Sequence, residues 1–373
     1  MLEFVIPCLL GLESLVDDEI KKLGLSDVRV ENGRVLCRGE ARDIARLNIN
    51  LRCGARVILV LHKFRATDFE SLFQGVRAVH WEDWIPREGE FPVVGYSINS
   101  TLHSVPACQS IVKKAVVDRL SAAYGIAQFP ETGRRYQVRF SIMKDEVTVG
   151  LDTSGEGLYK RGYRAHGVAA PLKETLAAAM VKLSHYNGRD PFCDPFCGSG
   201  TIAIEAALIA RNRAPGLNRS FAAQHWAMVD KRIWLDAADE AMDNEFHDKT
   251  YEIWGGDIDP HAVEIARHNA ELAEVDDTVR FEVDDATRFH WGGQYGRVVT
   301  NPPYGERLLE QKEAEELYRA FGRAVDKLPE TWRVYVLSSH TEFERCFGRT
   351  ADKKRKLYNG MLKCDLFMYG KRL

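Results

Sequence analysis

The sequence predicts an α/β protein in which a doubly wound, mostly parallel sheet follows two small α+β units. Three observations support this prediction: strand-like and helix-like segments alternate in the C-terminal half, a hairpin pattern ends the chain, and short strands mix with amphipathic helices before residue 155. The predicted boundaries of the three parts are 1–55, 56–160 and 161–373.

The C-terminal part alternates strands and helices, as expected for a sheet built from β-α-β units. The expected strands are 191–194, 251–256, 279–283, 297–300 and 332–338, and the expected helices are 200–211, 260–273 and 312–328. Beyond them, Asn359-Gly360 separates two strand-like runs, so we expect an antiparallel hairpin to close the sheet.

The N-terminal part predicts two separate α+β units. In the first, Asn32-Gly33 separates two strand-like runs, and apolar residues recur at helical spacing over 12–23 and 41–51. In the second, a helix over 105–124 lies between strands expected at 91–98 and 136–142. The glycine-rich stretch 154–170 is expected to connect this unit to the C-terminal part.

Composition is typical of a globular protein without membrane spans. The chain is 45% hydrophobic and 28% charged, and no apolar run reaches the roughly 18 residues that span a bilayer. Its first residues turn acidic and lack the basic leader of a secretory signal. The eight cysteines include no Cys-x-x-Cys pair, which predicts reduced thiols and no zinc site. We therefore expect a cytoplasmic protein that has neither membrane segments nor a metal.

Charge is unevenly distributed along the chain, although the net charge is only −3. Basic residues outnumber acidic ones by ten to six over 101–170 and by seven to two over 351–373, whereas acidic residues dominate 230–285. Such basic segments can form faces that contact phosphate even in a nearly neutral protein, or can simply be solvated.

A glycine-rich turn follows the strand expected at 191–194. The run Asp194-Pro195-Phe196-Cys197-Gly198-Ser199-Gly200-Thr201 leads directly into a helix. Glycines at such a turn let the backbone approach a ligand closely, and Asp194 is placed at the strand end where open α/β sheets bind ligands. A turn of this kind is weak evidence for any particular nucleotide, and it can also be purely structural.

Acidic residues end the next two strands as well. Asp257 follows Gly255-Gly256, and Asp284-Asp285 follows the strand over 279–283. The first could accept hydrogen bonds from the ribose of an adenosine and the second from its adenine amino group, although each could also cap a helix. A dinucleotide cofactor would require the ribose carboxylate about 20 residues after the glycines, whereas Asp257 follows only after a long insertion over 211–250.

A fourth motif, Asn301-Pro302-Pro303-Tyr304, follows the strand expected at 297–300 and has no use in a dehydrogenase. An amino group on an aromatic base is a poor nucleophile because its lone pair is conjugated with the ring. The Asn301 side-chain oxygen and the Pro302 carbonyl could accept both N–H groups and turn the lone pair toward a methyl donor. Pro303 stiffens this loop, and the ring of Tyr304 could stack on an extruded base.

The whole chain resembles the THUMP-domain class I RNA guanine-N2 methyltransferases of the YpsC/RlmL type. The resemblance is carried by LYKRGYRAHGVAAPLKETLAAAM (158–180), DPFCGSGTIAIEAA (194–207), GGDIDPHAVEIARHNAELA (255–273) and NPPYGERL (301–308). It implies a ferredoxin-like unit, then a THUMP domain that binds structured RNA, then a class I methyltransferase domain. The implied reaction uses S-adenosylmethionine to form N2-methylguanosine in rRNA or tRNA.

The resemblance also assigns roles to residues. Asn301, Pro302, Pro303 and Tyr304 would serve the target base. The cofactor would contact Asp194, Phe196, Gly198, Gly200, Thr201, Asp257, Ile258, Asp285 and Ala286, with Lys173 and Glu174 in the run from Pro171 that closes over it. Candidate phosphate contacts, chosen for their charge, are Lys113, Lys114, Arg134, Arg135, Arg161 and Arg164.

Two alternatives stay open at this point. One is an amino-methyltransferase that acts on adenine in nucleic acid, since the Asn-Pro-Pro-Tyr motif does not separate the bases. The other is an RNA-binding assembly factor that kept the fold without catalysis. The intact motifs around Asp194, Asp257 and Asn301 argue against the second.

Overall fold

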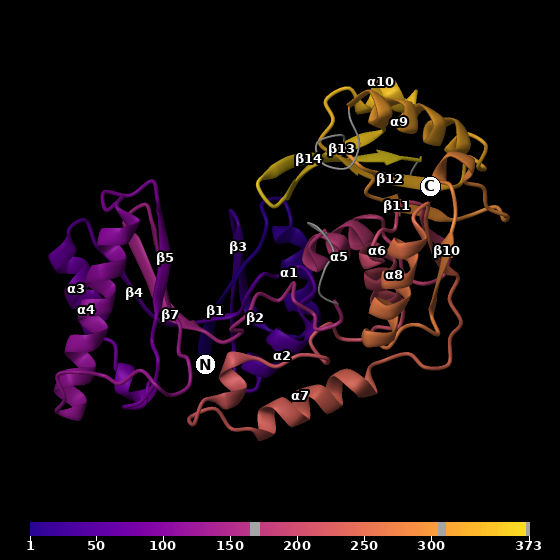
Figure 1. The fold of residues 1–373 in the computed structure, drawn as a ribbon. Coiled ribbons are helices and arrows are strands. Elements are labelled where there is room, and N and C mark those ends of the chain that lie inside the picture. Colours follow the sequence, from indigo (N-terminus) through magenta and orange to yellow (C-terminus); the bar gives the residue numbers. More distant parts are fainter. Residues whose placement is uncertain (165–171, 305–310, 371–373) are drawn as a thin grey trace. The chain divides into compact units, whose positions relative to one another are not determined.

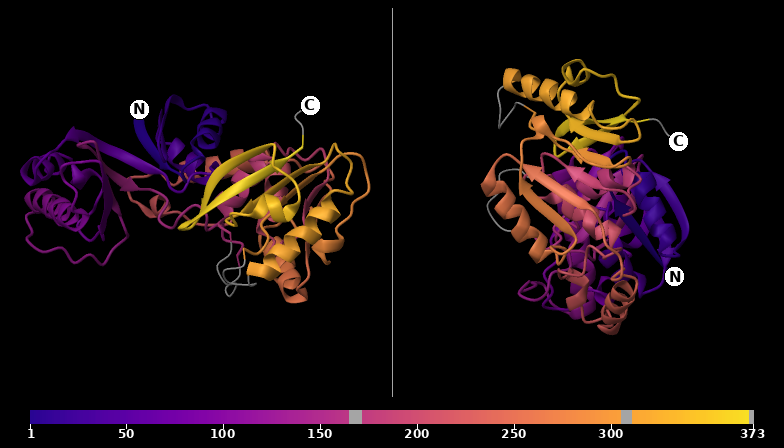
Figure 2. Two further views of the ribbon diagram at one scale, coloured as in Figure 1. Left: turned by 90° about the horizontal axis from the view of Figure 1, so that it is seen from above. Right: turned by 90° about the vertical axis from the view of Figure 1, so that its right-hand side faces the viewer.

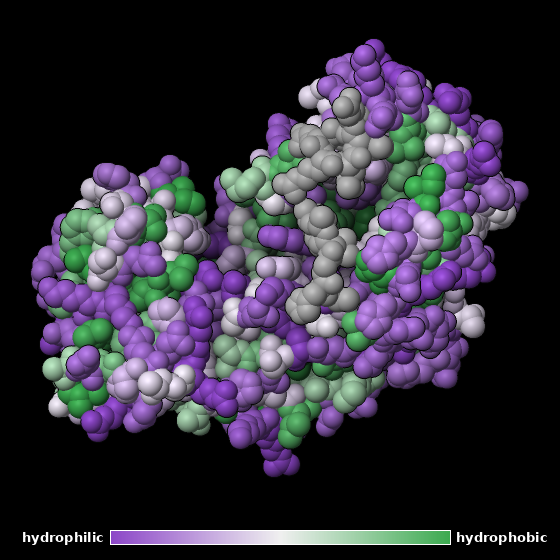
Figure 3. All heavy atoms as spheres, viewed as in Figure 1, coloured by the Kyte–Doolittle hydropathy of each residue, from purple (hydrophilic) through white to green (hydrophobic). Residues whose placement is uncertain are grey.

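The computed structural model describes residues 1–164, 172–304 and 311–370, which form two compact units. The first unit comprises 1–8, 16–158 and 220–240, and the second comprises 9–15, 159–219 and the chain from 241 onward. A seven-stranded sheet forms the centre of each unit (Figure 1). In the space-filling view, hydrophilic side chains cover most of the visible surface of each unit (Figure 3).

The sheet of the first unit has the strand order β2-β3-β1-β4-β7-β6-β5. Its strands are β1 (Leu2–Pro7), β2 (Ser26–Glu31), β3 (Arg34–Gly39), β4 (Ile58–Arg65), β5 (Val93–Ile98), β6 (Val138–Met143) and β7 (Glu146–Asp152). The helices of this part of the chain are α1 (Glu13–Lys22), α2 (Asp43–Asn50), α3 (Phe69–Arg77) and α4 (Val105–Tyr124). Because β1 pairs with β3 on one side and with β4 on the other, the two predicted α+β units share one sheet.

The sheet of the second unit has the order β10-β9-β8-β11-β12-β14-β13. Its strands are β8 (Phe192–Asp194), β9 (Ile253–Asp257), β10 (Val279–Val283), β11 (Arg297–Thr300), β12 (Arg333–Ser338), β13 (Lys353–Asn359) and β14 (Leu362–Tyr369). The first five strands in this order are parallel, and β14 and β13 are antiparallel. The predicted doubly wound sheet with a closing hairpin is therefore confirmed.

Helices cover both faces of this second sheet (Figure 2). They are α5 (Glu174–Leu183), α6 (Thr201–Ala210), α8 (Pro260–Leu272), α9 (Gln311–Val325) and α10 (Phe343–Phe347). On the face covered by α9 and α10, Val298 and Val336 pack against Phe321 and Phe343 in the main core cluster. Alternate residues of buried parallel strands face opposite layers, which is why these strands are apolar almost throughout.

The insertion after α6 contains a helix that the sequence pattern did not predict, α7 (Arg232–Asp243). Residues 220–240 belong to the first unit. There the indole N–H of Trp226 donates to the Arg135 carbonyl at 3.0 Å, and its ring stacks on Tyr136 at a centroid distance of 5.1 Å. Buried aromatic side chains, Trp226 among them, explain how this segment joins the first unit.

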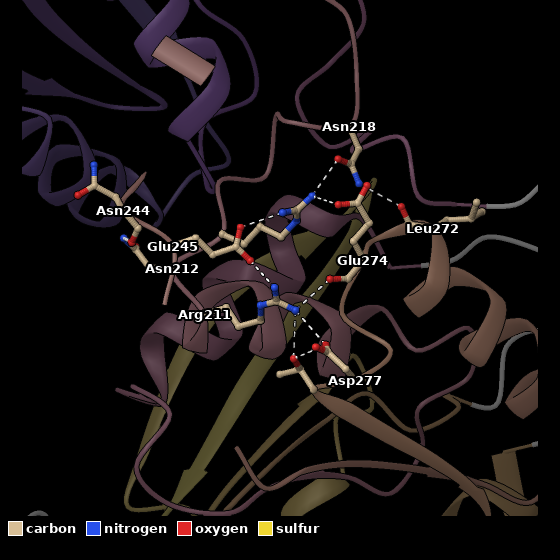
Figure 4. A network of polar contacts seen from close by, with 10 residues as sticks. Arg211, Asn212, Asn218, Asn244, Glu245, Leu272, Glu274 and Asp277 are labelled. Atoms are coloured by element: carbon tan, nitrogen blue, oxygen red, sulfur yellow. Dashed lines mark hydrogen bonds and ion pairs between the residues drawn. The ribbon is translucent and has the colours of Figure 1, made fainter. Parts of the chain in front are cut away.

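Two arginines that follow α6 bind the ends of the insertion to the second unit (Figure 4). Arg211 and Arg213 both pair with Glu245, whose side chain is 1% exposed, at 2.6 and 2.8 Å. Arg211 also pairs with Asp277, which is 73% exposed, at 2.9 Å. The two partners of Arg211 therefore differ mainly in burial.

This difference predicts unequal contributions to stability. Removing a partner from a buried ion pair leaves charges without compensation, so Glu245→Gln should lower the free energy of unfolding by about 3 kcal/mol. Asp277→Asn removes the same charge from a solvated position and should cost less than about 1 kcal/mol. Chemical denaturation of both variants measures the two values. Equal losses would show that Glu245 does not organise this network.

Candidate active site

Four parallel neighbours in the second sheet bring the sequence motifs to one edge. The sheet order is β10-β9-β8-β11, and the register pairs Asp194 with Gly255 and Val283 with Asp257. The carboxyl ends of these strands therefore lie side by side, followed by Asp284-Asp285, Asp257, Asp194 and Asn301. The structure thus gathers residues that are far apart in the sequence at the edge where open α/β sheets bind ligands.

Asp194 is a buried carboxylate, and one of its two oxygens has no hydrogen-bond partner among the described residues. Its side chain accepts from the Thr300 hydroxyl at 2.6 Å and from the Phe196 backbone N–H at 3.3 Å, both through Oδ1. Its Oδ2 is buried and has no hydrogen-bond partner among the described residues. Burial raises the pKa of this carboxyl to about 7, with nearby Asp257 acting in the same direction and Thr300 opposing it. A buried acceptor without a partner fits a cationic group of a ligand.

The structure gives a different reason for glycine at each of the two positions in the turn. Gly200 has a φ of +82° at the N-terminus of α6, and a side chain there would meet the ring of Phe281 at 2.8 Å. Gly198 has a φ of +50°, but a Cβ at Gly198 would meet nothing within 4 Å. The lack of a side chain at Gly200 is therefore required for packing, whereas Gly198 leaves open space for a ligand to approach the backbone.

The other turn residues predicted to contact the cofactor serve internal contacts. The Phe196 ring packs edge-on against Phe321 at a centroid distance of 5.0 Å. Thr201 is buried, and its hydroxyl accepts from Arg164 at 3.1 Å and lies 3.3 Å from that of Ser199. Their direct contact with a cofactor stays a prediction.

Asp257 and its neighbour combine a carboxylate with an exposed apolar side chain. The Asp257 carboxylate accepts from the Gly198 N–H at 2.9 Å and from the Asp259 N–H at 3.0 Å. Ile258, which follows it, is 71% exposed. Each carboxylate oxygen can accept more than one hydrogen bond, so Asp257 retains capacity for ribose hydroxyls, while Ile258 offers an apolar surface to a base.

Asp285 caps the short helix η3 (Ala286–Arg288). Its Oδ1 accepts from both the backbone N–H and the hydroxyl of Thr287, at 2.9 and 2.7 Å. Ala286 is buried behind it. The capping role that the sequence left open is therefore real, and an additional role toward adenine stays a prediction.

The two predicted phosphate contacts in the second unit pair with buried carboxylates, and for Arg161 this corrects the expectation drawn from its charge. Arg161 is 2% exposed and donates to Glu205 at 3.3 Å. Arg164 donates to Glu174 at 2.9 Å and to the Leu172 carbonyl at 3.0 Å. The buried Arg161 has no surface left for phosphate, whereas the side chain of Arg164 is 20% exposed and its contact with phosphate stays a prediction. Charge counts cannot reveal this pairing.

The structure describes the helix start that is predicted to close over the cofactor from Leu172 onward, and Pro171 lies outside the described residues. Residues 305–308, the end of the stretch NPPYGERL, also lie outside them. Glu174 is 3% exposed, and burial raises the pKa of its carboxyl while Arg164 opposes this shift. Lys173 is exposed, with its Nζ 5.1 Å from the centroid of Tyr159. Contact of either residue with a cofactor stays a prediction.

In the first unit, one of the four predicted phosphate contacts is also paired internally. Lys113 donates to Glu131 at 2.7 Å and to the Phe91 carbonyl at 3.0 Å, and its Nζ lies 3.5 Å from the centroid of the Phe91 ring. This amine has partners within its own unit, and its contact with phosphate stays a prediction. Lys114, Arg134 and Arg135 are exposed and remain predicted contacts.

The Asn301-Pro302-Pro303-Tyr304 loop is held by hydrogen bonds that the sequence did not reveal. The Tyr304 hydroxyl donates to the Asn301 Oδ1. The Tyr318 hydroxyl, from α9, donates to the Pro303 carbonyl at 2.6 Å. Burial raises the pKa of Tyr304 well above its usual value, so its hydroxyl stays protonated and able to donate. The loop therefore presents a fixed acceptor at Asn301.

Tyr318 and Thr300 are the supporting residues that sequence reasoning missed. Tyr318 recurs at helical spacing with Ala314 and Phe321 and is fully buried, so its pattern is that of a core residue. Thr300 ends β11 and is also fully buried, with its hydroxyl on Asp194. The sequence feature that could have predicted the role of Thr300 is its position, since it is a polar residue at the end of a buried strand, directly before the motif.

Two other classes of feature are absent from the part of the chain that the structure describes. No group of three or more His, Cys, Asp or Glu side chains there could hold a metal ion. Within the same ranges, no helix has the length and apolar composition that crossing a membrane requires.

Three family descriptions match successive parts of the chain. Residues 3–58 match the RlmL ferredoxin-like domain, residues 66–152 match the THUMP domain, and residues 161–367 match the RMKL-like methyltransferase domain. The last match covers more than half of the chain. The order of the three matches is the order that the resemblance implied.

Individual proteins match over nearly the full length. "Putative RNA methyltransferase YpsC" of Bacillus subtilis is 44% identical over 362 residues, which are 96% of this chain and 94% of that protein. A solved structure named as a predicted N6-adenine-specific DNA methylase from Listeria monocytogenes is 46% identical with a TM-score of 0.92, covering 99% and 96% of the two chains. Another, named as a "putative methyltransferase complexed with SAH", is 42% identical with a TM-score of 0.91, covering 100% and 99%.

The titration of Asp194 predicts how stability and ligand binding depend on pH. Because burial raises the pKa of Asp194 to about 7, the folded protein holds this proton more tightly than an unfolded chain, where aspartate titrates at about 3.9. The contribution of this group to the free energy of unfolding therefore falls as the pH rises from about 4 to about 7. A ligand ammonium beside Oδ2 requires the ionised carboxylate.

Affinity for S-adenosylhomocysteine should consequently fall as the pH decreases below about 7, by up to about tenfold per pH unit. Asp194→Asn should bind more weakly and show no such slope. Titration calorimetry across this range measures both. A flat profile for the unmodified protein, or an unchanged slope in the variant, would show that Asp194 does not receive the ammonium group.

Proposed function

This chain belongs to the RMKL-like methyltransferase family, with RlmL-type ferredoxin-like and THUMP domains, and from that premise we propose that it methylates the N2 amino group of a guanosine in structured RNA. The methyl donor is S-adenosylmethionine. The observation that carries the proposal is the placement of Asn301-Pro302-Pro303-Tyr304 at the end of β11, directly beside the strand that ends in Asp194.

The residues present fit this donor. S-adenosylmethionine supplies an electrophilic methyl group on a sulfonium and carries an ammonium, a ribose and an adenine. The partnerless buried Oδ2 of Asp194 suits the ammonium, and the open approach at Gly198 admits the ligand to the backbone. Asp257 would take the ribose hydroxyls, and the exposed Ile258 would pack against the adenine. A relative of 42% identity was solved with SAH, which is consistent with this use.

The catalytic loop supplies acceptors for the base. In the proposed complex, Asn301 Oδ1 and the Pro302 carbonyl each accept one N–H of the base amino group, which aligns the nitrogen lone pair with the methyl carbon. A nitrogen–carbon bond forms as the sulfur–carbon bond breaks, and the amino group then releases a proton to water. Because Tyr304 already donates to Asn301 Oδ1, the incoming N–H must share or replace that hydrogen bond.

The nature of the substrate rests on domain content and family. A THUMP domain in the first unit favours structured RNA over DNA, and the B. subtilis relative is named as an RNA methyltransferase. The family resemblance selects guanine, with rRNA as the first candidate and tRNA as the second. The L. monocytogenes relative is named for adenine in DNA, so methyl transfer to an adenine amino group is the second candidate. We also propose a cytoplasmic location.

Replacement of Asn301 tests the proposed chemistry. Asn301→Ala removes an acceptor that acts on the base and not on the methyl donor, so turnover should fall by at least about a hundredfold while S-adenosylhomocysteine binding is unchanged. Asn301→Asp keeps an acceptor and should retain more activity than the alanine variant. Mass spectrometry of nucleosides from treated rRNA and tRNA identifies the product. A methyl group on carbon, a ring nitrogen or ribose would contradict the mechanism, whereas N6-methyladenosine would overturn only the choice of guanine.

Replacement of Tyr304 separates its ring from its hydroxyl. Stacking on a base uses the ring, so Tyr304→Ala should raise the KM for RNA by roughly tenfold or more. Tyr304→Phe keeps the ring and frees Asn301 Oδ1, and its effect on KM should be mild. Steady-state kinetics with RNA as the varied substrate measures both variants. An equal rise in KM for the two would assign RNA capture to the hydroxyl instead of the ring.

A further inference from the structure

A basic groove of about 640 Å³ opens in the second unit, away from the candidate active site. Four basic side chains line it, and so do Met368 and the edge of the buried Tyr335, which is 6% exposed. The four are Lys182, Arg333, Lys353 and Arg355. Arg333 and Tyr335 are at the amino end of β12, whereas the candidate active site lies at the carboxyl ends of the parallel strands. The groove therefore does not belong to that site.

The N-terminal segment 9–15 borders the groove through Ser14 and Leu15. Arg355 donates to the Gly11 carbonyl and lies 3.5 Å from the Ser14 hydroxyl. Both partners are uncharged, so these contacts position the guanidinium without neutralising it. The acidic residue that lines the groove, Asp352, accepts from the Gly370 N–H at 2.7 Å.

The basic run near the C-terminus is divided between two faces of the β13-β14 ribbon. Alternate residues of a strand point to opposite faces, so Lys353 and Arg355 face the groove while Lys354 and Lys356 face away from it. On that other face, carboxylates compensate the lysines: Lys354 pairs with Glu344 at 2.7 Å, and Lys356 lies opposite Asp365 in the register.

On the groove face the cross-strand neighbours of the two basic residues carry no carboxylate. Lys353 is paired with Met368, which is paired in turn with Tyr335. Arg355 is paired with Leu366. The sequence shows one basic cluster over 351–373, but among the described residues of the β13-β14 ribbon the lysines with facing carboxylates lie on one face, and Lys353 and Arg355 lie on the other.

We propose that this groove binds a single-stranded stretch of the RNA substrate, with Arg333, Lys353 and Arg355 contacting its phosphates and the partly exposed Met368 contacting its bases. A positively charged groove that follows the phosphodiester backbone is a usual part of sites that bind single strands without sequence preference. An acidic peptide would also satisfy the cations, but the THUMP domain of this chain and the RNA methyltransferase name of its B. subtilis relative favour RNA. This inference rests on the proposed function, because it places the same RNA at a second site.

Two double variants with the same change of charge test the proposal in the full-length protein. Arg333→Gln with Lys353→Gln changes the groove, and Lys356→Gln with Lys363→Gln changes exposed lysines on the other face. The probe is a labelled oligouridylate, and its binding is measured over a range of salt concentrations. The groove variant should bind roughly tenfold more weakly at low salt, and its salt slope should fall by about 0.7 for each phosphate that the variant no longer binds. The control variant should match the parent protein.

Photo-crosslinking of the unmodified protein gives evidence that does not depend on the variants folding. Oligouridylate containing 4-thiouridine should crosslink to the peptides that carry Tyr335 or Met368. Crosslinks found only elsewhere, or equal losses of affinity in the two double variants, would overturn the proposal. Polyglutamate serves as the competing probe: a groove variant that loses polyglutamate binding but keeps oligouridylate binding would also overturn it, and would identify an acidic protein segment as the occupant.

Methyl transfer to RNA is measured separately, so the two proposals can fail independently. The groove variant should raise the KM for RNA and leave kcat unchanged, because the groove is distant from the reacting edge. If no RNA is methylated but oligouridylate binding still depends on the groove, the proposed reaction fails and this inference stands. If RNA is methylated with the same KM by all variants, the inference fails and the reaction stands.

Discussion

The parallel pairing of β8 with β9 on one side and β11 on the other is the constraint on which the second unit depends. It places the carboxyl ends of all three strands at one edge, so Asp194, Asp257 and Asn301 become neighbours although the chain leaves the sheet between each pair. Parallel strands need long crossover connections, and these cover both faces with helices. The long insertion lies within one such crossover, after α6, and therefore leaves the strand order intact.

Buried charge organises the space beneath the glycine turn. Arg161 and Arg164 neutralise Glu205 and Glu174, and Tyr163 adds a hydrogen bond to Glu205 at 3.1 Å. Charged groups are costly to bury unless they are paired, so this network keeps its geometry only when complete. Like Glu205 Oε2, the Asp194 Oδ2 has no hydrogen-bond partner among the described residues, but Asp194, unlike Glu205, has no arginine paired with it there. A buried carboxylate that lowers the stability of the folded protein indicates a functional role more than a structural one.

The catalytic loop is preorganised by two tyrosines with different tasks. Tyr318 reaches from the core of α9 to the backbone of the loop, and Tyr304 reaches within the loop to Asn301. The first hydrogen bond can persist throughout a reaction cycle, whereas the second occupies the acceptor that a base amino group would use. The hydrogen bond from Tyr318 thus keeps the loop backbone in place. The exchangeable hydrogen bond from Tyr304 satisfies the Asn301 oxygen until a base amino group replaces it.

The sequence by itself determined the sheet, the hairpin that closes it and the four motifs at the strand ends, because these depend on local patterns of apolar residues, glycines and prolines. The distribution of charge along the sequence was a poorer guide to the residues that contact phosphate. Arg161, Arg164 and Lys113 were as plausible for phosphate as Arg134, and only the tertiary structure showed that the first three pair internally. The same holds for the basic residues after 351, whose division between two faces depends on strand register and on what packs against each face. Pairing and burial are set by residues distant in the sequence, and no local pattern records them.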